Sequence, residues 1–228
     1  MFKLIRLEWK KNRIGKYVRN ALILTGVLFL LLLSVAGELE SDEAKYAYGG
    51  DMLKASVEMF TNLSFIIFSS VMLAAFIVSS YKDKTVNLMF SYPISRKMIL
   101  GSQMAAVWIF NFTALVLSKL AIYAALVAAK RFTHISAESI ALGNGMFYAQ
   151  ILADSAVMIS ISFVALPVGM LLKSSKAAII AGVVTVCFTQ GNIGSYTLLG
   201  NMPFYTVLMV IAAVSVFLAL YRVETRDV

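Results

Sequence analysis

The chain has 228 residues, of which 60% carry hydrophobic side chains, and its mean hydropathy is +0.83. Soluble domains contain about 45–50% apolar residues, so the composition excludes an ordinary soluble domain and predicts an all-α integral membrane protein. The net charge of +8 does not indicate a nucleic-acid partner, because the basic residues flank long apolar runs. The single cysteine excludes a disulfide framework.

The first 17 residues predict a helix that lies on the inner leaflet of a membrane. Four basic residues recur there at spacings of three and four, which lines them along one side of a helix. They would contact anionic lipid headgroups, with a tryptophan at the interface. A disordered tail that obeys the positive-inside rule stays an alternative. The residues of this predicted interfacial helix are Lys3, Arg6, Trp9, Lys10 and Arg13.

Six apolar segments are candidates for transmembrane helices, since a hydrocarbon core of about 30 Å needs roughly 20 helical residues. The third segment is longer than one span requires and should tilt or project beyond the bilayer. The fifth is short and ends in a polar run, which is typical of a helix that stops or turns back. We expect spans at 18–36, 57–79, 98–128, 146–171, 177–190 and 204–221.

The distribution of Lys and Arg predicts that both termini are cytoplasmic. With this orientation most of the 20 basic residues lie in inner segments, and the acidic loop at 37–56 faces outward. A signal peptide cleaved after Ala36 would instead leave five spans and an outer N-terminus. The long basic region before the first apolar run argues against such a signal. The basic residues in outer segments are Lys45, Lys54, Lys130 and Arg131.

The polar run YKDKTVNLMFSYPISRK, residues 81–97, interrupts the apolar chain on the predicted cytoplasmic side. Val86, Met89 and Phe90 fall at i, i+3 and i+4, so one face of a short helix would be apolar. Pro93 ends that helix, because the residue before a proline is pushed out of the α region. Ser95, two residues after Pro93, can cap the N-terminus of the third span. From spacing alone, a rigid surface helix and an ordinary loop are equal alternatives.

The same run resembles the loop between the second and third spans in the type-2 family of ATP-binding-cassette (ABC) transporter permeases. The family loop reads Glu-x-x-x-Gly-Thr, an apolar run and Pro-Ile-Ser-Arg, after which the third helix begins. Ser80 and Lys84 stand where the family has Glu and Gly, so no role of that Glu is carried over. The matching residues are Thr85, Leu88, Met89, Pro93, Ile94, Ser95 and Arg96.

This resemblance implies a coupling helix within 80–97 that docks into a cleft of a cytoplasmic ABC ATPase. It implies two permeases, this chain with a second copy or a related permease, and two ATPases that bind ATP and Mg²⁺. A re-entrant segment between spans five and six would correspond to 188–203. Permeases of this size resemble those that export bacitracin, lantibiotics or surfactant-like peptides from Gram-positive bacteria. The resemblance therefore implies peptide export, antibiotic resistance and a bacterial cell membrane.

Motifs for enzymatic chemistry are absent from the sequence. The chain has no G-x-x-x-x-G-K-[ST] run, whose backbone amides would cradle phosphates, so an ATPase must be a separate polypeptide. The one histidine, His134, has no neighbouring ligands for a metalloprotease site. Lipid phosphotransferases need clusters of aspartates, but here three aspartates are isolated and two lie in the outer loop. The isolated ones are Asp83, Asp154 and Asp227, and those in the outer loop are Asp42 and Asp51. We therefore expect no catalytic residue, no metal site and no cofactor bound by this chain.

Two ionisable residues lie inside predicted spans, where charges are costly and often functional. Lys119 lies about 32 Å along the third helix and Asp154 about 12 Å into the fourth, so a tilt brings them to similar depth. They could form an ion pair, or either could contact a charged cargo. Alternatively, Lys119 snorkels to outer headgroups and Asp154 bonds Ser155 or Ser160. We expect Glu58, at the outer start of the second span, to be solvated.

The resemblance implies an exporter, and the Met-rich and Phe-rich spans favour an amphipathic or hydrophobic cargo. Together they favour an antimicrobial or toxin peptide first. A non-transporting membrane sensor or anchor is an alternative, but the run after the last span, RVETRDV, is too short for an output domain. An ATP-independent carrier is another alternative. Carriers normally show internal repeats and clustered midplane charges, and the sequence shows neither.

Overall fold

A computed structural model describes residues 2–39, 52–82, 96–129, 145–190, 192–193, 196–197 and 202–225 of the chain. The chain divides into two compact units. Unit 1 consists of Met1–Ile14, Phe65–Phe112 and Ala156–Val228, and unit 2 consists of Gly15–Ser64 and Thr113–Ser155.

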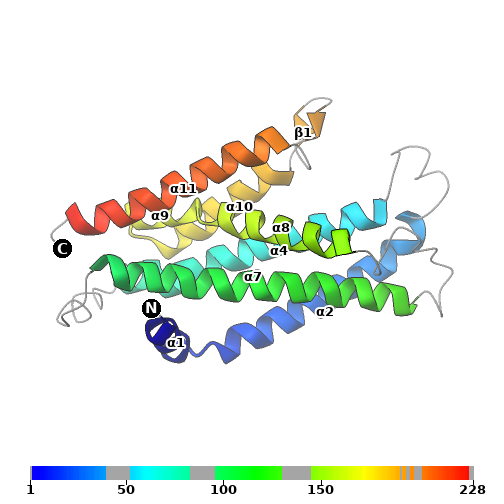
Figure 1. Cartoon of the computed structure of the whole chain (residues 1–228), viewed down its shortest axis with the longest axis horizontal. Helices are drawn as coiled ribbons and strands as arrows, with labels where there is room; N and C mark the ends of the chain where they lie inside the picture. The colour runs from blue at the N-terminus through cyan, green and yellow to red at the C-terminus, as the bar shows by residue number, and fades with distance from the viewer. Residues whose placement is uncertain are drawn as a thin grey trace. The chain divides into compact units, whose positions relative to one another are not determined.

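Helices make up nearly all of the described chain (Figure 1). Long apolar runs form them because a helix satisfies its own backbone hydrogen bonds, as a lipid environment requires. In chain order the elements are α1 (Phe2–Lys11), α2 (Gly15–Leu39), α4 (Met52–Leu73), the π-helical turn η1 (Ala74–Val78), α5 (Ser79–Lys82), α7 (Arg96–Ala129), α8 (Gly145–Ser162), α9 (Ala165–Leu171), α10 (Ser175–Gln190), β1 (Asn192–Ile193), β2 (Tyr196–Thr197) and α11 (Met202–Thr225).

Among the residues that the structure describes, four helical segments are long and apolar enough to cross a membrane. They confirm the first four predicted spans as helices with the length and composition of transmembrane segments. The fifth and sixth predicted spans correspond to the shorter apolar helices Ser175–Thr189 and Thr206–Tyr221. The four long segments are Gly15–Ala36, Met52–Val78, Lys97–Ala129 and Gly145–Leu171.

The fourth predicted span, 146–171, is two helices joined by a tight turn. Pro167 has no backbone N–H, and in a continuous helix its ring would clash with the carbonyl four residues earlier. That carbonyl belongs to Phe163. The amides of Phe163 and Val164 donate to carbonyls three residues back, at 3.1 and 3.0 Å, instead of four. The proline therefore separates α8 from α9.

The predicted interfacial helix is shorter than residues 1–17. It ends at Lys11, and residues 15–17 are the first residues of α2. Arg13 adopts a left-handed conformation, with φ of 50°, and the Ile14 amide donates to the Trp9 carbonyl at 3.0 Å. This turn closes the helix by satisfying carbonyls that have no partner within it.

Small residues bring the helices of unit 1 into close contact. A Cβ atom built on Gly169 would lie 2.6 Å from the Ala178 Cβ, so α9 and α10 touch at this glycine. A Cβ atom built on Gly182 would lie 2.1 Å from the Ser70 Oγ, where α10 meets α4. Such contacts let membrane helices pack by van der Waals attraction. Figure 1 shows α9, α10 and α11 side by side, and α9 contacts both neighbours.

Unit 2 has an apolar core of its own, formed by α2, the first part of α4, the last part of α7 and the first part of α8. The Tyr123 ring meets the Phe147 ring edge to face, with centroids 5.1 Å apart. Three of these helices, α4, α7 and α8, also carry buried polar side chains. The buried members of the core are Leu28, Leu32, Ala36, Leu53, Val57, Ile122, Tyr123, Leu126, Phe147 and Ile151.

Several predicted segments are described only in part. Within 188–203 the structure describes the end of α10, the antiparallel pairing of β1 with β2 and the start of α11, with Asn192 opposite Thr197. Of the outer loop at 37–56, residues 40–51 lie outside the described part. The coupling stretch lies outside it at 83–95, and α7 begins at Arg96. The predicted ATPase contacts at Thr85, Val86, Met89, Phe90, Pro93 and Ser95 therefore lie outside the described residues.

Candidate functional site

Unit 2 encloses a group of polar side chains within its apolar bundle. Lys119 on α7 is fully buried, and its Nζ lies 2.5 Å from the Asp154 Oδ2 on α8. Asn62 on α4 donates from its Nδ2 to the same carboxylate oxygen at 3.0 Å. The three side chains thus link three helices. With two further residues they form what we call the polar cluster: Glu58, Asn62, Lys119, Tyr123 and Asp154.

Helical periodicity places the polar cluster on facing surfaces. Glu58 and Asn62 are four residues apart on α4, and Lys119 and Tyr123 are four residues apart on α7. Residues at this spacing lie one above the other on the same side of a helix. Each of these two helices therefore contributes a pair of polar side chains, and Asp154 of α8 bonds one member of each pair.

The charges of the polar cluster differ in their access to the surface of unit 2. The Lys119 side chain is 0% exposed, whereas that of Asp154 is 27% exposed. Glu58 is half-buried, lies within electrostatic reach of Lys119 and Asp154, and forms no ion pair within the described part of the chain. We expected Glu58 to be solvated, and the structure leaves its side chain partly exposed. The two carboxylate side chains are thus partly exposed, whereas the Lys119 side chain is enclosed.

Three polar atoms at or beside the polar cluster are buried without a hydrogen-bond partner among the described residues. They are the Asn62 Oδ1, the Tyr123 hydroxyl and the Ser155 Oγ. Leaving a buried polar group unsatisfied costs about 1–3 kcal/mol. The cluster therefore keeps hydrogen-bonding capacity that its protein neighbours do not use.

The ion pair answers the alternatives that the sequence left open for Lys119 and Asp154. Lys119 does not extend toward headgroups, because its ammonium is enclosed and contacts Asp154. Ser160 bonds the Ala156 carbonyl and Trp108 instead of Asp154. Sequence reasoning missed Asn62, although its position four residues after Glu58 was a usable signal. Within the described part of the chain, no group of three His, Cys, Asp or Glu residues is placed to hold a metal ion.

The predicted basic contacts of α1 and the turn that follows it are exposed in unit 1. Lys3, Arg6, Lys10 and Arg13 all reach the surface. Trp9 is half-buried and donates its Nε1 hydrogen to the Ala106 carbonyl of α7 at 3.1 Å. The tryptophan thus attaches α1 to α7 through a hydrogen bond that spacing along the chain could not predict.

Glu8 provides the second attachment of α1. Its side chain is buried, and the Gln103 Nε2 of α7 donates to its Oε1 at 3.4 Å. Asn12 donates to the Glu8 carbonyl at 3.1 Å. The sequence signal was a single acidic residue within a strongly basic helix, and sequence reasoning did not use it.

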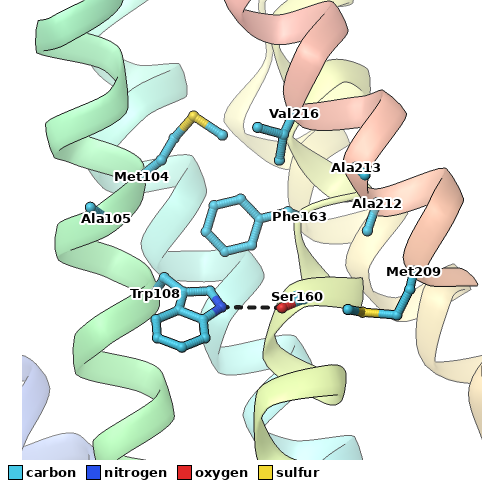
Figure 2. Close-up of a pocket in the computed structure, with 9 residues that line it drawn as sticks. All are labelled: Met104, Ala105, Trp108, Ser160, Phe163, Met209, Ala212, Ala213 and Val216. Carbon is cyan, nitrogen blue, oxygen red and sulfur yellow. Dashed lines mark hydrogen bonds between the residues drawn. The ribbon is translucent and has the colours of Figure 1, made fainter.

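A cavity of about 430 Å³ lies in unit 1 between α7, the α8–α9 turn and α11. Figure 2 shows the Trp108 Nε1 donating across it to the Ser160 Oγ, a contact of 3.2 Å. Apart from these two residues its lining is apolar, and Met104 and Met209 contribute flexible thioether side chains. The other lining residues are Ala105, Phe163, Ala212, Ala213 and Val216.

The long apolar helices define the class of this protein as a helical membrane protein. No family model matches the chain, and no solved structure matches it. The chain is similar to the uncharacterized protein YcbO of Bacillus subtilis (strain 168), with 28% identity over 191 residues. The alignment covers 80% of this chain and 81% of that protein, so the likeness extends along most of both.

Proposed function

We propose that the chain is the transmembrane permease subunit of an ATP-driven ABC exporter. The observation that carries this proposal is the order of residues from Thr85 to Arg96, which resembles the coupling loop of type-2 ABC permeases. In that family the third helix begins directly after Pro-Ile-Ser-Arg, and α7 begins at Arg96. The proposal includes six spans and two cytoplasmic termini in a bacterial cell membrane.

The docking of α1 supports this proposal. Trp9 and Glu8 attach α1 to the early part of α7, which follows the predicted coupling stretch. Figure 1 shows α1 almost end-on where α7 runs across the page, so the two helices cross. A helix that crosses a span and exposes basic residues is suited to an anionic inner leaflet. Movement of the coupling stretch would then act on a helix anchored at that surface.

The partners follow from the same proposal. A cytoplasmic ABC ATPase would bind ATP and Mg²⁺, and a second copy of this chain or a related permease would complete the translocation pathway. The segment at 188–203 would be the re-entrant element of the outer side. The chain itself would perform no catalysis.

The cargo would be amphipathic or hydrophobic, with an antimicrobial or toxin peptide first. The apolar cavity of unit 1 supports this, because its volume lies within the range of about 300–1,000 Å³ typical of ligand pockets. Its only polar pair, Trp108 and Ser160, is already hydrogen-bonded together. A bound group would therefore make apolar contacts there.

An ATP-independent carrier is a second candidate, and the polar cluster favours it. Ionisable residues within membrane spans mark substrate and ion pathways in carriers. A carrier would transport in proteoliposomes without nucleotide, whereas the proposed exporter would require an ATPase partner. A sensor or anchor would not transport in proteoliposomes, with or without an ATPase partner.

Co-purification in mild detergent tests the exporter proposal. The tagged chain is isolated from its native membranes, and mass spectrometry identifies its partners and their stoichiometry. We expect a P-loop ATPase in an amount equal to the chain. A chain with intact residues 80–97 that brings down no ATPase in several detergents would contradict the proposal.

A further inference from the structure

The charges of the polar cluster are arranged to attract a cation. Its enclosed ammonium, on Lys119, already bonds the Asp154 Oδ2. The Glu58 carboxylate is half-buried and forms no ion pair with any residue that the structure describes. Lys54, one turn before Glu58, is within its electrostatic reach, but the Lys54 Nζ lies 5.5 Å from the centroid of the Phe147 ring. The accessible groups of the cluster are thus its carboxylates.

An unused acceptor lies in the same place. Asn62 is 2% exposed, and its Oδ1 has no hydrogen-bond partner in the described part of the chain. Its amide nitrogen bonds the Asp154 Oδ2, which holds the whole amide group against the cluster. Because Lys119 and Asn62 both bond Oδ2, the Asp154 Oδ1 is also left to accept a hydrogen bond.

We propose that the polar cluster binds the primary ammonium group of a cationic amphiphile. An ammonium group carries three N–H donors, and three acceptors of the cluster have no hydrogen-bond partner among the described residues: the Glu58 carboxylate, the Asp154 Oδ1 and the buried Asn62 Oδ1. Hydrogen bonds between charged groups are shorter and stronger than neutral ones. The site would recognise the N–H donors of the ligand as well as its charge. A quaternary ammonium has the charge but no N–H donor, so it would not bind in this way.

The surroundings of the polar cluster select an amphiphile over a small hydrated cation. The polar cluster lies on α4, α7 and α8, whose helical segments are long and apolar enough to span a membrane, and Met59 and Leu152 are exposed apolar side chains of α4 and α8. A hydrated inorganic ion would have to leave water to reach acceptors on membrane-spanning helices. An amphiphile keeps its tail in hydrocarbon and brings only its head group to the acceptors. This binding requires no ATPase, so its test is separate from that of the proposed function.

Calorimetry on the full chain in zwitterionic lipid nanodiscs tests the proposal, with empty nanodiscs to subtract partitioning into lipid. The probes are dodecylammonium, its trimethylated analogue, which keeps the charge but has no N–H donor, and dodecanol. We expect saturable binding of dodecylammonium at one site per chain. The two analogues should bind about tenfold more weakly or not at all, since hydrogen bonds to charged groups are the strong ones.

Two variants connect the binding to the polar cluster. Glu58→Gln keeps the shape of the side chain and leaves the Lys119–Asp154 pair intact, and we expect it to weaken dodecylammonium binding about tenfold. Glu8→Gln removes a carboxylate from unit 1 and should leave binding unchanged. Equal affinity of Glu58→Gln and the unaltered chain would overturn the proposal. Tight binding of the trimethylated analogue, or uptake that does not exceed that of empty nanodiscs, would overturn it as well.

Discussion

The Lys119 ammonium and the Asp154 carboxylate lie 2.5 Å apart, with the lysine side chain fully enclosed and the aspartate partly exposed. The two charges compensate one another inside an apolar bundle, where a single charge would be costly. A buried pair of this kind is weak evidence for net stability, but the loss of one partner leaves an uncompensated charge. The unequal exposure of the two side chains makes the cost depend on which partner is lost.

Asp154→Asn should destabilise the protein more than Lys119→Met does. The first change leaves an enclosed ammonium without a counter-charge and should lower the free energy of unfolding by about 3–5 kcal/mol. The second leaves a carboxylate that can still reach the surface. Equilibrium unfolding in mixed detergent micelles measures the free energy of unfolding of both variants. The double variant should have a free energy of unfolding closer to that of the unaltered chain than Asp154→Asn has. Lys176→Met, at an exposed position, is the matched control, and a larger effect of Lys119→Met would refute the prediction.

Gly182→Ala should disrupt the contact between α10 and α4. The new Cβ would meet the Ser70 Oγ at 2.1 Å and the Ser70 Cβ at 2.4 Å, and overpacking of this kind costs about 1–3 kcal/mol. Thermal unfolding in detergent measures the loss, and adding Ser70→Gly should restore part of it. Gly26→Ala is the control, because no atom lies within 4 Å of its Cβ position. If both alanine variants unfold at the same temperature, close approach at Gly182 is not a determinant of the fold.

Trp9→Phe should loosen α1 from α7. The change keeps an aromatic ring but removes the hydrogen bond to the Ala106 carbonyl, which is worth about 1 kcal/mol. Hydrogen exchange of the α1 amides should therefore become about fivefold faster. Leu7→Ala removes a side chain that is 61% exposed and should leave exchange unchanged. Unaltered protection in Trp9→Phe would mean that another contact holds α1.

Phe90→Asp or Met89→Asp should uncouple the chain from its proposed ATPase. Each places a charge on the apolar face of the predicted coupling helix, which would dock into an ATPase cleft. Insertion should persist, as measured by the amount in the membrane fraction, while co-purification of the ATPase falls at least tenfold. Asn87→Asp makes the same charge change on the predicted polar face, and this variant should co-purify the ATPase as the unaltered chain does. A parallel loss of insertion and of the ATPase would instead mean that residues 80–97 are structural.

The break between α8 and α9 shows which features hydropathy can predict and which it cannot. Hydropathy predicts that 146–171 is apolar enough to span, and the structure agrees with that. The break follows from Pro167, a local steric effect that hydropathy averages away. The end of α1 was missed for a similar reason, because Arg13 occupies a left-handed conformation that usually belongs to glycine.

For the polar cluster too, the sequence predicts some features and not others. The sequence predicts that Lys119 and Asp154 are unusual, because each interrupts an apolar run. It does not predict that Asn62 bonds Asp154 or that Glu58 remains half-buried, since both depend on which faces of α4, α7 and α8 meet. Glu8 was missed because its partner Gln103 lies 95 residues away on α7.

By itself, the sequence determined that this is a helical membrane protein and where its long apolar helices lie. Those properties depend on local composition, because lipid forces each apolar segment to satisfy its backbone within one helix. Only the tertiary structure decided that Lys119 pairs with Asp154, that Asn62 joins them and that Trp9 attaches α1 to Ala106. These contacts depend on the rotation and register of packed helices, which are set by side chains far apart in the chain.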